Sequence, residues 1–461
     1  MKRTIPYPIM AAALLLASAW ACGSSDTTPS INTGVCGMTA HQWLPAQQVG
    51  ALRDSEKMAL YSMNADTIAY LLASEGYGDV VQPRYDVQVH KYRYTTQDRG
   101  VSIEATSVVG YPELEDGQSL TLPVVLWLHG TTGFMGDCAP SATEEDAGLP
   151  AMIFASQGYV IVEPDYLGMN GFGDPSPLHH PYLVSEATAL ASWDALRAAE
   201  VFLAQEAPGV TIDPARVIIW GGSQGGHATL AAELYQPYYA PEYHPVAALA
   251  LVPPSDLLSQ TTRALTSFVP ASLNLAAMLA AAGRWYGMGD RLAEVLTDDE
   301  PNHIAVNLPL LMDTTCDVES DQYQVDDIGD LYQPTFIEAA LNHNWQGYEQ
   351  WKCLLTENSF MYTKAVKRIS DTPFMFVLSQ LDDLVNSPIE EAAYDTLCSQ
   401  GYRMNFMECE GAGHSQGALW SLPEQLDWVE HRLAGEDLAD QCTRPAAFCC
   451  SLSDEDACTG R

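Results

Sequence analysis

The chain has 461 residues, of which 47% are hydrophobic, so it holds enough apolar material to bury a large core. Against 21 basic side chains stand 59 acidic ones, and the formal net charge at pH 7 is −38. A surface of this charge repels phosphate backbones and anionic membranes, which argues against nucleic acid as a partner and favours neutral or cationic substrates.

The first 21 residues have the pattern of an export signal. A basic pair is followed by an apolar stretch over residues 9–20, too short to span a bilayer, and by the small-x-small sequence AWA at residues 19–21. Cys22 comes next and opens a flexible linker, residues 22–36. The arrangement resembles a bacterial lipoprotein signal, in which this cysteine is lipidated. Ordinary cleavage to a secreted or periplasmic protein is the alternative. A lipid anchor at Cys22 is the only membrane attachment that we expect.

The segments after the linker predict first a helical wrap and then a sheet. Residues 38–78 alternate helical and turn signals, whereas residues 85–95 and 101–110 alternate polar with β-branched and aromatic side chains, which predicts two antiparallel strands. Continuously apolar strands then alternate with helical segments, as in a parallel sheet covered on both faces. These strands are predicted over residues 122–128, 159–162, 217–220, 246–252, 373–379 and 403–409. The helices are predicted over residues 148–157, 183–206, 227–235, 388–398 and 422–433.

A long insertion interrupts this alternation. Residues 253–372 show helical patterning, for example at 270–284, and we predict that they form a helical cap over the carboxyl edge of the sheet, where sites in such sheets lie. The predicted fold class is therefore α/β, a mostly parallel sheet flanked by helices, with the cap inserted before the last two strands. The core would span residues 37–252 and 373–435, followed by an acidic, cysteine-rich tail at 436–461.

A serine stands in the turn between one strand and the helix after it. Gly221-x-Ser223-x-Gly225 follows directly on an apolar run and precedes a helical one. A nucleophile elbow requires this pattern, because the sharp turn that raises the serine leaves almost no room for side chains two residues away. A bystander serine in a glycine-rich turn is the alternative. The flanking strand and helix favour the elbow, and we take Ser223 as the nucleophile.

A nucleophilic serine needs a base and a carboxylate to orient that base, and on such a sheet they follow in the order Ser, Asp, His. Asp382 and Asp383 follow the strand at 373–379, and side-chain alternation sends only one of them toward the site. We choose Asp382, with Asp383 as the alternative acid. His414 follows the strand at 403–409 behind two glycines that let the loop fold back, and it is the expected base.

Four other histidines have plainer interpretations. His227 lies one helical turn beyond the elbow, where the helix axis carries it away from the site, and is expected to pack. His129 ends its strand and is expected to fix the loop that follows. His179 and His180 stand in a proline-rich loop and are expected to serve its turns.

The oxyanion that forms during attack on an ester needs two backbone N–H donors already in place. Gln224 follows the nucleophile at the start of a helix and would supply one. The loop after the strand at 122–128 leaves the same edge of the sheet and would supply the other, from Gly130 or Thr131.

We expect neither a metal nor a cofactor. An EF-hand loop needs a glycine at its sixth position and a carboxylate at its twelfth. Counted from Asp317 in the acidic stretch at 313–330, these positions hold Gln322 and Ile328, so we interpret the stretch as solvated cap surface. Asp165 and Tyr166, at the end of their strand, are expected to be structural.

Ten cysteines remain when Cys22 is set aside, an even number that can form five disulfides in an oxidising compartment. The last four crowd the acidic tail and are expected to pair among themselves, since their spacing lacks the CxxC pairs of a zinc site. They are Cys442, Cys449, Cys450 and Cys458. Cys398 and Cys409 are not expected to pair with each other, because one ends a helix at the amino edge of the sheet and the other ends the next strand at the opposite edge.

Five short motifs resemble those of a known family. They are HGTTGFMGDCAPS (129–141), PDYLG (164–168), GGSQGGHA (221–228), DDLV (382–385) and GAGH (411–414). Together they resemble the α/β-hydrolases and, more closely, the secretory lipase family of the fungal lipase A type, over residues 124–433. The sequence departs from the family pattern at Asn386, where proline is common, and in its cysteine-rich tail.

The resemblance implies Ser223 as nucleophile, Asp382 as acid, His414 as base, and residues 253–372 as a lid over an acyl-binding tunnel. In that framework a disulfide from Cys138 to Cys316 or Cys353 would tether the lid.

We therefore expect a serine hydrolase that cleaves carboxylic esters, of the lipase or carboxylesterase type, with acylglycerols or similar lipid or small-molecule esters as substrates. A serine peptidase on the same fold is one alternative, and a non-catalytic exported binding protein is another. The sequence leaves the oligomeric state open.

Overall fold

The computed structural model describes residues 31–317, 325, 327–454 and 458. The expected export signal and Cys22 lie outside these residues, as does part of the acidic stretch at 313–330. Within the described residues, none of the helices combines the length and the apolar character needed to cross a bilayer.

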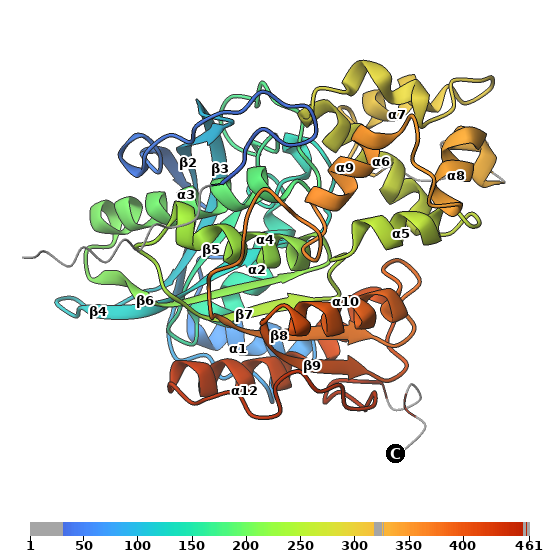
Figure 1. Cartoon of the computed structure of the whole chain (residues 1–461). Helices are drawn as coiled ribbons and strands as arrows, with labels where there is room; N and C mark the ends of the chain where they lie inside the picture. The colour runs from blue at the N-terminus through green and yellow to red at the C-terminus, as the bar shows by residue number, and fades with distance from the viewer. Residues whose placement is uncertain (1–30, 318–324, 326, 455–457, 459–461) are drawn as a thin grey trace, which may run out of the picture. The chain divides into compact units, whose positions relative to one another are not determined.

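A nine-stranded sheet forms the centre of the described residues (Figure 1). Its order is β1-β2-β3-β5-β4-β6-β7-β8-β9, and the pairs β1–β2, β2–β3 and β3–β5 are antiparallel whereas the other five are parallel. The strands are β1 (Leu52–Lys57), β2 (Val87–Asp98), β3 (Val101–Pro112), β4 (Leu120–Leu128), β5 (Val160–Pro164), β6 (Val210–Gly222), β7 (Pro245–Leu251), β8 (Pro373–Ser379) and β9 (Arg403–Cys409). The prediction of a mostly parallel sheet is confirmed.

Helices cover both faces of the sheet and connect its parallel strands. The α-helices are α1 (Ala65–Ser74), α2 (Glu144–Ala155), α3 (Ser185–Glu206), α4 (Gln224–Tyr239), α5 (Leu257–Ala264), α6 (Ala271–Trp285), α7 (Ile304–Met312), α8 (Pro334–Leu341), α9 (Glu349–Glu357), α10 (Ser387–Ser399), α11 (His414–Trp420) and α12 (Leu422–Leu433). Short 3-10 turns occur at η1 (Ala46–Gln48), η2 (Gly136–Cys138), η3 (Gly289–Glu294) and η5 (Ile328–Asp330).

Each face of the sheet has its own apolar core. Along β4, Val124 and Leu126 join a cluster with α3, α4 and α10, while Val125 between them joins another with α1, α2 and α12. The period of two in a strand divides the side chains in this way, and burial on both faces explains why the central strands are continuously apolar. Figure 1 shows α3 and α4 on one side of the strands and α12 on the other.

The N-terminal region differs from its prediction. We expected a helical wrap over residues 38–78, and α1 does lie there, but Leu52–Lys57 forms β1 and pairs antiparallel with β2. The sequence of β1, LRDSEK, is charged and largely exposed, as is common at a sheet edge, where charged side chains discourage pairing with other chains. It has no apolar alternation to predict it, so its pairing with β2 alone makes it a strand.

The insertion lies where the sequence predicts it, between β7 and β8. Its helices α5 to α9 pack on one another and gather beyond one end of the strands (Figure 1). Apolar side chains of α6 and α9 also belong to the core on the α3 and α4 face. The insertion is therefore packed onto the sheet domain rather than joined to it by a linker.

The disulfides tie the insertion and the tail to the sheet domain. Cys138–Cys316 joins the loop after β4 to the insertion, which confirms the expected tether, and Cys36–Cys353 joins the N-terminal segment to α9. The pairing predicted within the tail is wrong except for Cys449–Cys458. Cys442 pairs with Cys398 and Cys450 with Cys409, so Cys398 and Cys409 are indeed not joined to each other.

Backbone pairing with β9 explains these cross-links. Phe448 donates its N–H to Glu408 O (3.0 Å) and accepts from Glu410 N (2.8 Å), so the tail runs beside the strand and brings Cys450 to Cys409. The tail thus covers the free edge of β9, which would otherwise expose unpaired backbone groups.

Candidate active site

Ser223 occupies a strained turn between β6 and α4. Its φ is +57°, a value that non-glycine residues rarely adopt, and its N–H donates to Leu251 O (2.9 Å). A Cβ on Gly225 would overlap the Leu128 carbonyl oxygen, and a Cβ on Gly221 would overlap the backbone of Gly225. The two glycines are therefore a steric requirement of this turn, as a nucleophile elbow demands.

Three residues predicted from the sequence converge at the carboxyl edge of the sheet. Ser223 Oγ donates to His414 Nε2 over 2.8 Å, and His414 Nδ1 donates to Asp382 Oδ2 over 2.7 Å. The Asp382 side chain is 1% exposed and that of His414 is 13% exposed. The three groups come from the ends of β6, β8 and β9, so hydroxyl, imidazole and carboxylate form one continuous chain of hydrogen bonds.

The geometry separates the two adjacent aspartates. The second oxygen of Asp382 accepts from Leu384 N (3.0 Å) and Val385 N (2.8 Å), so backbone N–H groups hold the carboxylate in its orientation toward His414. Asp383 is exposed, and its contact with Arg263 is made through its backbone carbonyl. The alternation that favoured Asp382 agrees with this arrangement.

His414 itself begins a helix that the sequence analysis missed. The short helix α11 starts at His414 and is capped by Gln416, whose side chain accepts from Gly413 N (2.7 Å). Ser379 Oγ at the end of β8 accepts from Gly417 N (3.1 Å) and donates to His414 O (3.2 Å). These bonds fix the histidine between two strand ends, whereas a flexible loop would leave its position open.

The two expected sources of oxyanion donors flank the nucleophile. Gln224 begins α4 directly after Ser223, and a Cβ built on Gly130 would lie 3.9 Å from Ser223 Cβ. The hydroxyl of Thr131 hydrogen-bonds that of Tyr182 (2.9 Å), so its side chain points to a neighbouring wall. Gly130 and Thr131 thus both lie beside the nucleophile, as expected for the loop after β4.

The loop at Gly130 is held by His129, as expected. His129 Nδ1 donates to Gly130 O (2.7 Å), and its ring stacks on Tyr166 with centroids 4.3 Å apart. The Tyr166 hydroxyl donates to His129 O (3.0 Å). Asp165 is fully buried and accepts from Ser141 N (3.0 Å), and burial raises its pKa to about 6. Both residues after β5 thus have the structural contacts predicted for them.

Two further histidines make contacts away from the nucleophile. His227 is buried, donates from Nε2 to Asn358 O (2.9 Å) and packs against Phe360, and burial lowers its pKa to about 4. His179 is half exposed and lies 2.8 Å from Asp313 in the insertion. The packing predicted for His227 is confirmed.

His180 has a role that the sequence analysis did not foresee. It is buried, and its Nδ1 lies 2.9 Å from Leu167 O, a carbonyl that can only accept, so the proton is on Nδ1. Burial lowers the pKa of His180 to about 4, which keeps the ring neutral and leaves Nε2 as an acceptor. The side-chain amide of Gln224 donates to this Nε2 over 2.9 Å. His180 therefore orients the residue whose N–H adjoins the nucleophile.

Replacing His180 with phenylalanine should lower kcat for an ester about 10-fold and change KM little. The phenyl ring would keep the packing beside Tyr166. The buried side-chain amide of Gln224 would lose its acceptor, at a cost of about 1–3 kcal/mol. The backbone N–H of Gln224, which this bond helps to hold in place, acts mainly in the transition state. Steady-state kinetics would separate the two parameters. A loss confined to KM, or none at all, would contradict this positioning role.

Three hollows meet at Ser223. One, of about 520 Å³, lies under α5 and α6 and has apolar walls that include Leu257, Ala264, Leu275 and Met278. Another, of about 1060 Å³, is more polar and lies along the loop of Gly130, Thr131 and Thr132 and the start of α11. The remaining hollow, of about 900 Å³, lies on the face of the sheet that α2 and α12 cover. The nucleophile is thus accessible from more than one direction.

A buried acid supports the wall of the apolar hollow under α5. Glu390 on α10 accepts from Gln260 Nε2 (2.9 Å) and from Ser255 N (3.1 Å), and Gln260 lines the hollow. Burial raises the pKa of Glu390 from 4.5 to about 7. Below about pH 7 the protonated form of Glu390 is therefore favoured in the folded chain.

The contribution of Glu390 to the free energy of unfolding should fall as the pH rises from 5 to 8. The pKa of Glu390 is higher in the folded chain than in the unfolded one, so its contribution is present in full below 4.5 and is lost as the pH rises through about 7. A difference of this size corresponds to on the order of 3 kcal/mol. Urea unfolding at several pH values should show that the free energy of unfolding of the wild type, minus that of Glu390→Gln, falls over this range. A difference that stays constant with pH would contradict the assignment.

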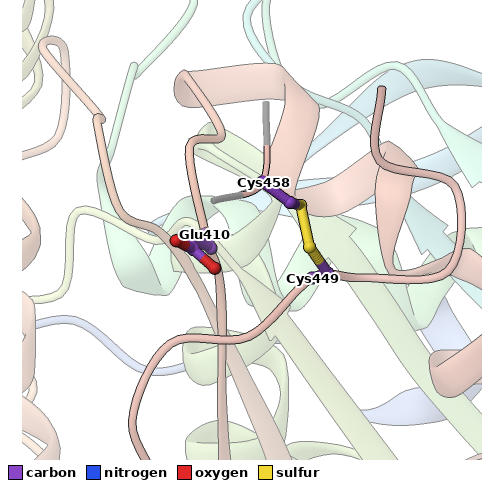
Figure 2. Close-up of side chains that lie close together, drawn as sticks. All are labelled: Glu410, Cys449 and Cys458. Atoms are coloured by element: carbon purple, nitrogen blue, oxygen red, sulfur yellow. A yellow bond between two sulfur atoms is a disulfide. The ribbon is translucent and has the colours of Figure 1, made fainter. Parts of the chain in front are cut away.

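One group of possible metal ligands occurs among the described residues. Glu410, Cys449 and Cys458 lie with their ligand atoms within 4.8 Å of one another at the end of β9. Figure 2 shows, however, that the two cysteine sulfurs are bonded to each other. A disulfide offers no thiolates, so this group cannot bind zinc while it is oxidised.

Comparisons with known proteins agree with this architecture. The esterase LipA of Xanthomonas oryzae, which degrades rice cell walls, superimposes with a TM-score of 0.65 at 22% identity, over 84% of this chain and 99% of its own. Candida antarctica lipase A in its closed state gives a TM-score of 0.61 at 16% identity, over 88% of each chain. A search of curated protein sequences finds no match.

The family model for secretory lipases matches residues 149–441, which include Ser223, Asp382 and His414. The match covers more than half of the 461 residues. The mostly parallel sheet and its flanking helices match the lipase and esterase structures of the α/β-hydrolase fold. This chain belongs to the secretory lipase family, whose members are carboxylic ester hydrolases.

Proposed function

We propose that the chain hydrolyses carboxylic esters through an acyl-enzyme on Ser223. The observation that supports this most directly is the chain of hydrogen bonds from Ser223 through His414 to Asp382. In this mechanism Ser223 Oγ attacks the ester carbonyl while His414 Nε2 takes its proton, and Asp382 stabilises the imidazolium that forms. His414 then gives the proton to the leaving alcohol, and water releases the acid by the same steps in reverse.

The oxyanion of each tetrahedral intermediate would be bound by backbone N–H groups. Gln224 supplies one, and Gly130 or Thr131 supplies the other from the loop after β4. Each such donor contributes about 3 kcal/mol to the transition state in serine hydrolases. No step of this mechanism needs a metal or a cofactor.

The substrates we propose are acylglycerols or similar neutral esters. The hollow under α5 and α6 has apolar walls suited to an acyl chain, and residues 253–372 would act as the lid over it, on a core formed by residues 37–252 and 373–435. A net charge of −38 disfavours anionic substrates.

Family membership and the five disulfides among the described residues indicate an exported protein. We propose that it is either secreted or periplasmic, or held at a bacterial membrane by a lipid on Cys22. Mass spectrometry of the mature N-terminus tests this, because an unmodified Cys22 would exclude the anchor.

A fluorophosphonate probe combined with a substrate panel tests the proposed activity. We expect the probe to label Ser223, identified by peptide mapping, and p-nitrophenyl esters to be hydrolysed far faster than peptide p-nitroanilides. Faster turnover of the anilides would indicate a serine peptidase. Absence of labelling and of turnover would indicate a non-catalytic binding protein.

A further inference from the structure

Two apolar pockets begin at Ser223 and lie on opposite faces of the sheet. The cap pocket is the hollow under α5 and α6, whose Leu257, Ala264 and Leu275 belong to the core on the α3 and α4 face. The second, which we name the Trp127 pocket, lies between α2, α11 and α12, and most of its apolar walls belong to the other core. They include Trp127, Ile153, Phe154, Trp220, Ala418 and Leu419.

The base lines one of these pockets and not the other. His414 and Ser415 line the Trp127 pocket, whereas the cap pocket includes Ser223 without His414. The leaving oxygen must receive its proton from His414 Nε2, so the alcohol part of an ester has to lie on the side of His414. The acyl part extends from the same carbonyl carbon in another direction, toward the cap pocket.

The walls of the Trp127 pocket suit a hydrocarbon. Two of its polar side chains bond within the wall: Trp220 Nε1 donates to Gln425 Oε1 (3.1 Å), and Gln425 Nε2 donates to Ala418 O (2.6 Å) and to Ser421 Oγ (2.7 Å). The polar groups of Trp220 and Gln425 are therefore already satisfied, and most of the surface left to contact a ligand is aromatic or aliphatic. The more polar hollow along Thr131 and Thr132 is the alternative direction for a hydrophilic alcohol.

We propose that the Trp127 pocket binds the alcohol side of the substrate, as an alkyl or aromatic arm of the leaving group. This inference rests on the proposed ester hydrolysis and names its substrate class: esters with an apolar arm on each side of the scissile bond. The acyl arm enters beneath the insertion, and the alcohol arm enters between α2 and α11 on the opposite face of the sheet.

The experiment fills each pocket with the same side chain. Ala418 on α11 is partly buried and lines the Trp127 pocket, and Ala271 on α6 is partly buried and lines the cap pocket. For Ala418→Phe we expect the ratio of kcat/KM for octyl hexanoate over methyl hexanoate to fall about 10-fold, the scale on which a filled pocket discriminates chain length. The ratio for methyl dodecanoate over methyl butanoate should stay as in the wild type. Ala271→Phe should give the converse pattern.

A second variant covers the case in which Ala418→Phe does not fold. Leu419, at the mouth of the Trp127 pocket, is 48% exposed, so Leu419→Glu disturbs little packing and sets a charge beside the alcohol arm. It should lower the octyl to methyl ratio in the same way.

The inference is overturned if the folded variants at residues 418 and 419 keep the wild-type alcohol ratio, or if their acyl ratio changes instead. A wild-type enzyme that hydrolyses no ester and takes up no fluorophosphonate would overturn the proposed function itself, and the two failures are therefore distinct.

Discussion

Replacing Ser223 with alanine should lower kcat for a p-nitrophenyl ester by about 10⁶-fold and abolish labelling by a fluorophosphonate. The hydroxyl is the atom that attacks, and without it His414 and Asp382 have no nucleophile to activate, so their contributions are lost together. Residual turnover would reflect only the oxyanion donors and substrate binding. Initial rates with purified protein at matched concentrations would measure the loss.

An exposed serine provides the matched control for this variant. Ser399 lies at the end of α10, where its hydroxyl donates to Thr396 O (2.7 Å), and Ser399→Ala should keep wild-type rates. Thermal unfolding of both variants would show that the fold is intact. Wild-type activity in folded Ser223→Ala would refute the acyl-enzyme mechanism.

Replacing Asp382 with asparagine should lower kcat by about 10⁴-fold without unfolding the chain. An asparagine oxygen can still accept from Leu384 N and Val385 N, so the side chain keeps its place. Its amide then donates to His414 Nδ1, which moves the imidazole proton to Nε2, the atom that has to accept the proton of Ser223. The geometry would be retained with the wrong tautomer.

The neighbouring aspartate tests whether this loss depends on position. Asp383→Asn removes the same charge one residue away, where the side chain is exposed and the contact with Arg263 is made by the backbone. We expect its kcat to stay within about 3-fold of the wild type, since surface charges contribute little. If Asp383→Asn showed the larger loss, the acid would be Asp383, the alternative left open by the sequence.

Features that depend on neighbouring residues could be predicted from the sequence. The Gly221-x-Ser223-x-Gly225 turn is determined by sterics within five residues, and the buried strands show as apolar runs because both of their faces are covered. The chain order of Ser223, Asp382 and His414 then followed from strand ends that share one edge. All three lie within one chain of hydrogen bonds.

Features that depend on distant partners could not be predicted. The charged strand β1 has no local pattern and exists through its pairing with β2. Cys450 is beside Cys449 in the sequence, yet its partner is Cys409, because the tail runs along β9. The sequence shows His180 only as part of a proline-rich loop, and its contact with Gln224 exists only in the folded chain.

The sequence by itself determined the local conditions for catalysis: the elbow, the order of the catalytic groups, the alternation of strands and helices, and the position of the insertion. The tertiary structure alone decided the disulfide partners, the support behind Gln224 and the pair of apolar pockets on either side of the nucleophile. The physical reason is the range of the interactions. Backbone sterics and side-chain periodicity act over a few residues, whereas pockets and cross-links arise where segments hundreds of residues apart pack against each other.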